Sequence, residues 1–285
     1  MSYEPQKPLV LVAGAGRLPL VAARSHRAGG GRLHLVSLTG EIPPELGELA
    51  EEAVVLSVGQ VGGILDFALG TGARQVSLLG KVVKGKLFDG LKLDALAMKL
   101  WLANRDRSDR GIMRTLADLA GERGLEVVSQ LEVLRELVTP EGALTKRKPK
   151  TVEVQDARLG FRLALECARS GIGQTVLVRG GIVVAVEALE GSDRCLARAG
   201  ELTRGDSRLF RGGLVMAKAA GRDHDVRFDV PTVGMDTLAK AREAGVTCIA
   251  LESGRSLIAD GVDEFAKTAA ELGIAVLGMS GDFPD

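Results

Sequence analysis

The sequence is poor in the residue types that several classes of protein require. It holds one Trp, one Tyr and seven Phe in 285 residues, and 37 Lys plus Arg balance 37 Asp plus Glu, so the formal net charge is zero. Without a basic surface or aromatic stacking platforms, we expect no nucleic-acid partner. The apolar run at 9–13 is far too short to span a bilayer, and the N-terminus lacks a signal-peptide pattern. We therefore expect a cytoplasmic protein.

Cysteine and histidine are also scarce. The three cysteines are scattered without a C-x-x-C, which suits a reducing compartment and argues against structural zinc. The three histidines, His26, His34 and His224, cannot supply a three-histidine zinc site or a histidine-rich two-metal phosphoesterase site. Any metal is therefore expected to be a hard cation such as Mg²⁺, which prefers carboxylate oxygens.

What the chain does have is an alternation of short β-branched runs and amphipathic segments. In the first half the expected strands are 9–13, 33–38, 53–56, 76–79 and 126–128, with helices such as 19–28 and 109–123 between them. This alternation is typical of βαβ units with a parallel sheet. It predicts an α/β domain over residues 1–140.

The second half has a different texture. Residues 141–160 hold a basic cluster, a proline and glycines with little apolar content, and we interpret them as a linker. In residues 161–285, the stretch TVLVRGGIVVAVEALE predicts two strands joined by a Gly180-Gly181 hairpin turn. Further strands and glycine-terminated helices follow, so we predict a second α/β domain with a mixed sheet.

The first motif is VLVAGAGRLP at 10–19. Gly14 and Gly16 follow an apolar strand, and Pro19 suits the first turn of a helix. Such a turn can present amide hydrogens to an anion. As a dinucleotide fingerprint it is incomplete, because Pro19 replaces the third glycine. Nicotinamide binding, binding of another nucleotide or phosphate, and a plain tight turn all remain open.

The second motif, VEALEGSDRCLARAG at 186–200, leads from a strand into a short helix that begins near Arg194. Ser192 or Asp193 suits the N-cap of that helix. The acids Glu187, Glu190 and Asp193 could also hold a hydrated divalent cation whose other ligands are phosphates.

The third motif is GRDHDVRFDVPTVG at 221–234. Its apolar residues alternate with charges, which predicts a strand with Asp225, Arg227 and Asp229 on one face; the alternative is a solvated loop. Lys218 and Arg227 are suited to phosphate oxygens, and arginine can bind two at once. Asp229 would then orient Arg227.

Together with AGAGRLP and SLLGKV at 77–82, these blocks resemble the UDP-2,3-diacylglucosamine pyrophosphatases of the LpxI family, in the same order and at similar spacing. Departures from the family pattern include Ser192 for threonine, His224 for glutamine, and Arg110 for the second acid of a pair that begins at Asp109. The matching residues are Glu187, Glu190, Gly191, Asp193, Leu196 and Arg198 in the second block, and Lys218, Asp225, Arg227, Asp229, Pro231, Thr232 and Gly234 in the third.

The resemblance implies an N-terminal Rossmann-like domain and a C-terminal domain of the family's own type. It implies Mg²⁺-dependent hydrolysis of UDP-2,3-diacylglucosamine to UMP and 2,3-diacylglucosamine 1-phosphate in lipid A synthesis, with water attacking the sugar-side phosphorus. We predict Asp225, Lys218 and Asp193 as catalytic residues, and Asp225, Glu190 and Asp193 as metal ligands. The predicted substrate-binding residues are Gly14, Gly16, Arg17, Gly80, Lys81, Gly191, Ser192, Arg227 and Thr232.

Two other functions remain open: a nucleotide-sugar-binding regulator without catalysis, and an NAD-linked oxidoreductase. The segment 81–105 combines an apolar helical stripe with lysines, which is compatible with peripheral contact to the inner membrane or with an ordinary core-facing helix. A homodimer is compatible with the sequence.

Overall fold

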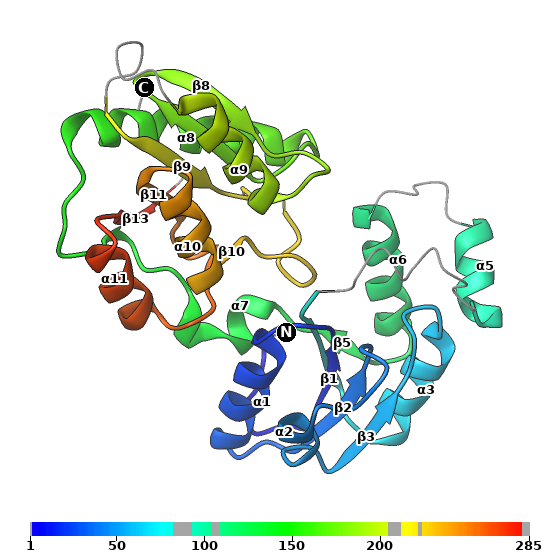
Figure 1. The fold of residues 1–285 in the computed structure, drawn as a ribbon. Helices are drawn as coiled ribbons and strands as arrows, with labels where there is room; N and C mark the ends of the chain where they lie inside the picture. The colour runs from blue at the N-terminus through cyan, green and yellow to red at the C-terminus, as the bar shows by residue number, and fades with distance from the viewer. Residues whose placement is uncertain (1, 82–92, 104–108, 205–211, 222–223, 281–285) are drawn as a thin grey trace. The chain divides into compact units, whose positions relative to one another are not determined.

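The computed structural model describes residues 2–81, 93–103, 109–204, 212–221 and 224–280. The chain divides into two compact units (Figure 1). Unit 1 comprises Met1–Leu134 with Asp225–Phe228, and unit 2 comprises Arg135–His224 with Asp229–Asp285. Among the described residues, every helix is too short or too polar to cross a bilayer.

Unit 1 is built on a parallel sheet with strand order β3-β2-β1-β4-β5, which is Rossmann-like. Its strands confirm the sequence prediction, with small differences at their ends. They are β1 (Leu9–Ala13), β2 (Leu33–Ser37), β3 (Glu52–Val55), β4 (Gln75–Leu79) and β5 (Glu126–Val127). The helices are α1 (Leu18–Ala28), α2 (Pro44–Gly47), α3 (Val61–Gly70), α5 (Ala95–Ala103), α6 (Asp109–Glu122) and α7 (Gln130–Val133).

The core of unit 1 follows from strand periodicity. Val10 and Val12 of β1 pack in one buried cluster with residues of α3 and α6. Leu9 and Leu11 are fully buried as well and point to the opposite face of the sheet. A parallel sheet covered on both faces requires such continuous apolar strands, which explains why β1 lacks polar alternation.

Unit 2 contains a six-stranded mixed sheet with order β6-β13-β11-β9-β7-β8 and a two-stranded sheet of β10 and β12. The strands are β6 (Gly142–Ala143), β7 (Thr175–Arg179), β8 (Ile182–Val186), β9 (Leu214–Lys218), β10 (Thr232–Val233), β11 (Val246–Glu252), β12 (Leu257–Ile258) and β13 (Ala275–Met279). The helices are a 3-10 turn (Arg135–Leu137), α8 (Thr151–Arg169), α9 (Ser192–Thr203), α10 (Met235–Glu243) and α11 (Val262–Glu271).

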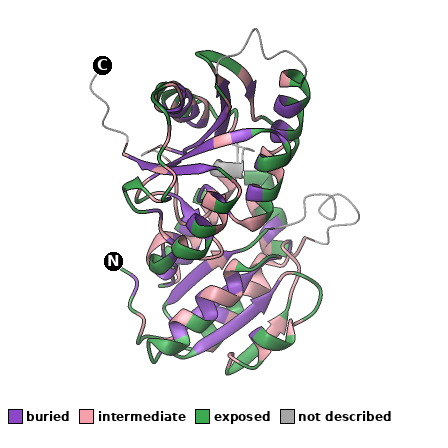
Figure 2. Ribbon diagram, turned by 60° about the vertical axis from the view of Figure 1, so that its left-hand side comes forward, coloured by how far each residue is buried: buried purple, intermediate pink, exposed green. Residues whose placement is uncertain are grey.

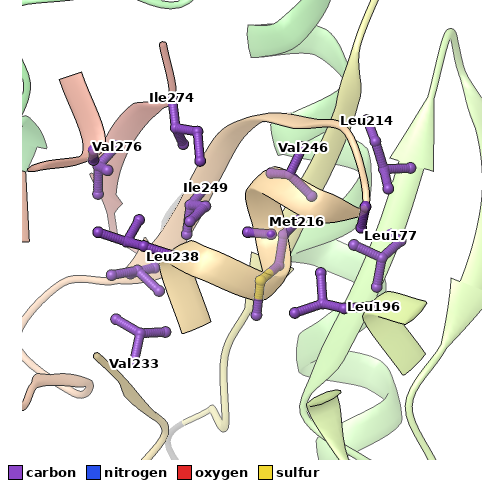
Figure 3. Close-up of a cluster of buried hydrophobic side chains, with 14 of the residues drawn as sticks. Leu177, Leu196, Leu214, Met216, Val233, Leu238, Val246, Ile249, Ile274 and Val276 are labelled. Atoms are coloured by element: carbon purple, nitrogen blue, oxygen red, sulfur yellow. The ribbon is translucent and has the colours of Figure 1, made fainter. Parts of the chain in front are cut away.

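Two buried clusters lie on opposite faces of the six-stranded sheet. Val176 and Val215 pack with Phe161 of α8. The neighbouring residues Leu177 and Met216 pack with side chains of α9, α10 and α11 (Figure 3). In Figure 2 the strands are largely buried, whereas each helix is buried along one side. Unit 2 is therefore a three-layer α/β/α arrangement.

The predicted hairpin is confirmed, because β7 and β8 pair antiparallel, with a register shift between Leu177 and Val178. Gly180 and Gly181 both have positive φ, at 59° and 79°. A two-residue hairpin turn requires this conformation, and glycine adopts it without strain.

The predicted linker over 141–160 differs from the structure. It contains β6, and residues 151–160 form the first half of α8. The basic cluster is folded onto the start of this helix: the buried carboxylate of Glu153 accepts hydrogen bonds from Lys150 N and Arg147 Nη2, both at 2.7 Å. Composition alone conceals this helix, because its charges are paired locally.

Candidate functional site

Two glycine loops cross at the carboxyl ends of β1 and β4 in unit 1. A Cβ on Gly14 would lie 2.7 Å from Lys81 O, and one on Gly80 would lie 2.7 Å from the Gly14 carbonyl carbon. Ala15 and Lys81 exchange two main-chain hydrogen bonds of 2.9 and 2.7 Å. The strand order reverses between β1 and β4, which is where open α/β sheets bind ligands.

The other predicted residues of this loop lie at the start of α1. Gly16 has φ 108°, and Arg17 is the N-cap residue of the helix. The five predicted residues at 14, 16, 17, 80 and 81 are thus gathered at one edge of the sheet. A helix start behind a backbone turn suits a phosphate group.

Residues 225–228, predicted as part of a strand, form a turn instead. Asp225 Oδ1 accepts hydrogen bonds from Arg227 N at 3.2 Å and Nε at 2.9 Å, and Oδ2 accepts one from Nη2 at 2.7 Å. Phe228 N donates to Asp225 O at 3.2 Å. The Asp225 side chain closes a local turn that competes with strand pairing, although the sequence alternates with period two. Arg222 and Asp223 lie outside the described residues.

This turn belongs to unit 1 and is attached at the carboxyl end of β4. Gln130 N donates to Val226 O at 3.1 Å, while Gln130 Nε2 donates to Leu78 O at 2.7 Å. One glutamine at the start of α7 therefore ties the turn to the central sheet of its own unit.

The guanidinium of Arg227 is firmly charged. The hydrogen bond to Asp225 raises its pKa and outweighs partial burial, and the charge of Asp118 contributes in the same direction as that of Asp225. Arg227, which Asp229 was predicted to orient, is thus held by Asp225.

In unit 2 a buried lysine is the centre of a polar cluster. Lys218, at the end of β9, is 7% exposed. Its Nζ donates to Ser192 Oγ at 2.7 Å and to Thr175 Oγ1 at 3.2 Å, and lies 3.7 Å from Glu187 Oε2. Glu187 Oε2 is buried without a hydrogen-bond partner among the described residues. The cation and the two hydroxyls can donate to phosphoryl oxygens, whereas the Glu187 carboxylate can only accept hydrogen bonds and balances the charge of the lysine.

A second polar group lies near this lysine. Asp229 Oδ2 accepts hydrogen bonds from His224 Nε2 at 3.0 Å and from Gln174 Nε2 at 2.5 Å. Desolvation opposes ionisation of Asp229, whose side chain is nevertheless 61% exposed, but the hydrogen bond and charge of His224, the hydrogen bond from Gln174 and the charge of Lys218 outweigh it and lower its pKa. Asp229 therefore stays ionised close to Lys218.

The predicted acids of the second motif are each engaged by a cation. Glu190 Oε1 accepts from Arg198 Nη2 at 2.7 Å, and Asp193 pairs with Lys240. Hydrogen bonds from its own main chain, from Arg198 and from Ala188 N lower the pKa of Glu190, so its carboxylate is held in the ionised form that a phosphate-bound metal ion would need.

The N-cap of α9 is Gly191, with φ 81°, so the prediction of Ser192 or Asp193 as the cap is wrong. Ser192 instead turns its hydroxyl toward Lys218, which donates to it. Because the cap residue is a glycine, no side chain caps this helix, and Ser192, its first residue, is available to accept the hydrogen bond from Lys218.

The three predicted metal ligands are divided between the two units. Asp225 belongs to unit 1, whereas Glu190 and Asp193 belong to unit 2. Within the part of the chain that is described, no three His, Cys, Asp or Glu side chains are arranged to hold a metal ion. Mg²⁺ commonly takes only one or two protein carboxylates and completes its shell with water and substrate phosphates. A carboxylate that lies outside a cluster of acids could therefore contribute one ligand to an ion that is bound mainly by phosphate.

Sequence reasoning does not reveal several residues around Lys218. Thr175 begins β7, and its assignment to a strand hides the role of its hydroxyl. Glu252 and Arg255 contact the backbone after β9, although neither lies in a charged run.

The predicted residue Thr232 lies in β10. Its Oγ1 donates to Val230 O at 2.9 Å, across the proline that separates the two residues. In this structure its hydroxyl has a local structural role.

Two comparisons with known proteins give the same family. The model of the LpxI N-terminal domain matches residues 8–137, and that of the LpxI C-terminal domain matches residues 140–277. The UDP-2,3-diacylglucosamine pyrophosphatase LpxI of Caulobacter vibrioides is 32% identical over 280 residues, which cover 96% of this chain and 98% of that protein.

Solved structures are similar only in part. The biotin carboxylase domain of Hydrogenobacter thermophilus 2-oxoglutarate carboxylase is 17% identical, with a TM-score of 0.27 over 61% of this chain and 35% of that chain. N5-carboxyaminoimidazole synthetase from Staphylococcus aureus is 12% identical, with a TM-score of 0.29 over 62% of this chain and 34% of that chain. Likenesses this weak carry no argument. Because both domain models match in order and together span nearly the whole sequence, the chain belongs to the LpxI family.

Proposed function

We propose that this chain hydrolyses the pyrophosphate bond of UDP-2,3-diacylglucosamine, releasing UMP and 2,3-diacylglucosamine 1-phosphate in lipid A synthesis. The observation that carries the proposal is the buried Lys218 with its two hydroxyl partners, in a chain that aligns over nearly its whole length with a protein named for that activity. Pyrophosphate cleavage by water needs neutralisation of phosphoryl charge and a positioned nucleophile, with little covalent chemistry from the protein.

In this proposal Lys218 binds phosphoryl oxygens. Its ammonium is already desolvated and held by Thr175 and Ser192, so it needs little reorganisation when charge develops on the phosphate. Glu187, 3.7 Å away, balances its charge when no phosphate is bound. The buried position makes the interaction stronger than it would be in water.

Asp225 and Arg227 take complementary roles. Asp225 binds Nε and Nη2 of Arg227, so the remaining N–H groups of the guanidinium would bind phosphate oxygens. Asp225 would also orient the attacking water toward the sugar-side phosphorus, in line with the leaving UMP. In unit 2, Asp193 in the first turn of α9 and Glu190 just before its N-cap are the proposed acidic groups.

We also propose that Mg²⁺ takes part as an ion bound to the pyrophosphate, with Asp225 as its protein ligand. Such an ion polarises a phosphoryl oxygen and helps to align the phosphates. Within unit 1, the glycine loops are proposed to bind substrate through the predicted residues Gly14, Gly16, Arg17, Gly80 and Lys81.

The test is to incubate the purified protein with UDP-2,3-diacylglucosamine and Mg²⁺ and to measure UMP. UMP release that EDTA stops and added Mg²⁺ restores is the expected result. Substrate retention without UMP would favour the non-catalytic regulator, and a change in nicotinamide absorbance would favour the oxidoreductase. Full activity in a metal-free sample would overturn the role of Mg²⁺.

Contact with the cytoplasmic face of the inner membrane is a further part of the proposal. On α5, Leu96 packs against the core of unit 1, but Met98, Trp101 and Leu102 are exposed, Leu102 to 75%. The lysines at 84, 86 and 92 lie outside the described residues. Co-sedimentation with anionic vesicles should weaken in Trp101→Ser/Leu102→Ser and persist in Leu202→Ser, an exposed leucine on α9 of unit 2. A homodimer is proposed as well, and light scattering in solution would test it.

A further inference from the structure

The backbone that follows Lys218 is held by two side chains from another part of unit 2. Ala220 N and Gly221 N both donate to Glu252 Oε2, at 2.9 and 3.0 Å. Glu252 is the last residue of β11 and is 3% exposed. A buried carboxylate is costly unless its oxygens are hydrogen-bonded, so these two amides account for its placement here.

Arg255 binds carbonyl oxygens of the same backbone segment. Its Nη2 donates to Gly221 O at 2.8 Å and to His224 O at 3.2 Å. Its Nε lies 3.6 Å from Glu252 Oε1, so the two side chains form an ion pair. Glu252 thus accepts from main-chain N–H groups and Arg255 donates to main-chain carbonyl oxygens. None of these contacts involves the side chains of Ala220, Gly221 or His224.

The ion pair is itself anchored on rigid elements. Strands β11 and β9 are parallel, and Leu251 is the register partner of Lys218. Glu252, the next residue of β11, therefore lies beside the backbone that follows Lys218. The turn that carries the arginine is fixed by Ser256, whose Oγ donates to Glu252 O at 2.7 Å and lies 2.8 Å from Thr139 Oγ1, a hydroxyl that can donate to it in turn.

We infer that Glu252 and Arg255 are positioning residues for the site proposed above, on which this inference rests. They fix the backbone at Ala220, Gly221 and His224, next to the phosphate-binding lysine and to the His224–Asp229 pair. A displacement of about 1 Å in a positioned group can lower the rate by on the order of 10²-fold. The contacts of Glu252 and Arg255 with the backbone after Lys218 should therefore affect kcat. Neither residue touches the substrate in this role.

The chain offers a matched control for a purely structural role. Glu153 is also buried, at 2% exposed, and it too accepts a main-chain N–H and pairs with an arginine, Arg147. These bonds hold the start of α8 and not the backbone after Lys218. Glu252→Gln and Glu153→Gln therefore each remove one buried carboxylate charge from unit 2, but only Glu252 contacts the backbone that follows Lys218.

The experiment compares kcat and KM for UMP release in the full-length variants, below the melting temperature of each. Glu252→Gln should lower kcat by about 10- to 100-fold with a smaller change in KM, whereas Glu153→Gln should keep kcat within about twofold at a similar loss of Tm. Arg255→Lys, the milder change, should retain part of the rate that Arg255→Met loses. Equal kcat values for the two glutamine variants would overturn the inference.

Hydrogen exchange gives a second readout that does not depend on turnover. The amides of Ala220 and Gly221 should exchange slowly in the wild type and in Glu153→Met, and much faster in Glu252→Met, because methionine, unlike glutamine, offers them no side-chain oxygen as acceptor. Unchanged protection in Glu252→Met would show that Glu252 does not hold this backbone. If the wild type releases no UMP but the amides respond as expected, the proposed function fails while the positioning of the backbone stands.

Discussion

The two units offer phosphate-suited surfaces that are made in different ways. Unit 1 uses main-chain atoms, where Gly14 and Gly80 let two loops cross at the end of the sheet. Unit 2 uses side chains, where Lys218 reaches hydroxyls 43 and 26 residues away in the sequence. The first surface depends on the absence of Cβ atoms and the second on one buried charge. Substitutions should therefore affect stability first at the glycine loops and rate first at Lys218.

The largest effect is expected at Lys218. Lys218→Met keeps most of the buried aliphatic stem but removes the ammonium, so kcat/KM for UMP release should fall by at least ~10³-fold, because a preorganised charge in a desolvated site is lost. Lys267→Met is the control, since Lys267 lies on the exposed face of α11 in the same unit. A loss of less than tenfold in Lys218→Met would show that unit 2 does not neutralise phosphate charge.

Asp225→Ala should have the next largest effect. It removes the group that holds Arg227 and is proposed to orient the water, so kcat should fall by about 10²-fold with folding largely intact. The control is Glu264→Ala on the exposed face of α11. Asp260 is unsuitable as a control, because its Oδ2 accepts from Met235 N at the start of α10 and its loss would cost about 1 kcal/mol. Equal kcat in Asp225→Ala and Glu264→Ala would remove Asp225 from the site.

In unit 1 the next prediction concerns stability. Gly80→Ala would place a Cβ 2.7 Å from the backbone of Gly14, at a φ of 94°, and should lower the free energy of unfolding by about 2 kcal/mol. Gly70→Ala is the control, because a Cβ there meets no atom within 4 Å. Urea unfolding of the two variants gives the comparison. If Gly80→Ala were as stable as Gly70→Ala, the crossing of the loops would be wrong.

The smallest effect is a pH dependence at Glu153. Burial raises its pKa, but the hydrogen bonds from Arg147 Nη2 and Lys150 N and the charge of Arg147 outweigh burial, so the folded-state pKa lies below the ordinary value of 4.5. The ionised form is therefore favoured by folding, and its contribution is present above the unfolded-state pKa and lost as pH falls through the folded-state value. The difference in urea midpoint between wild type and Glu153→Gln should be largest near neutrality and shrink below about pH 4. A constant difference would contradict this assignment.

The fold is largely predictable from the sequence, whereas the contacts of the site are not. Continuous apolar runs, and glycines at the ends of strands and helices, are local signals. They locate β1 to β5 and the β7–β8 hairpin. The turn at Asp225 is hidden because a side chain that bonds its own backbone can sit within a strand-like alternation of residue types. Glu252 and Arg255 are hidden because they contact residues about 30 positions away, and no spacing rule reports such contacts.

The edge strand β8 has a consequence for the behaviour of the protein in concentrated solution. In the described part of the chain it ends the six-stranded sheet, and it exposes Ile182 to 51% and Val183 to 40%. An apolar edge with unpaired peptide groups is a template for strand addition. Because the formal net charge is zero, long-range repulsion does little to keep copies apart. Val183→Lys would place a charge on this edge and should improve solubility without touching the site.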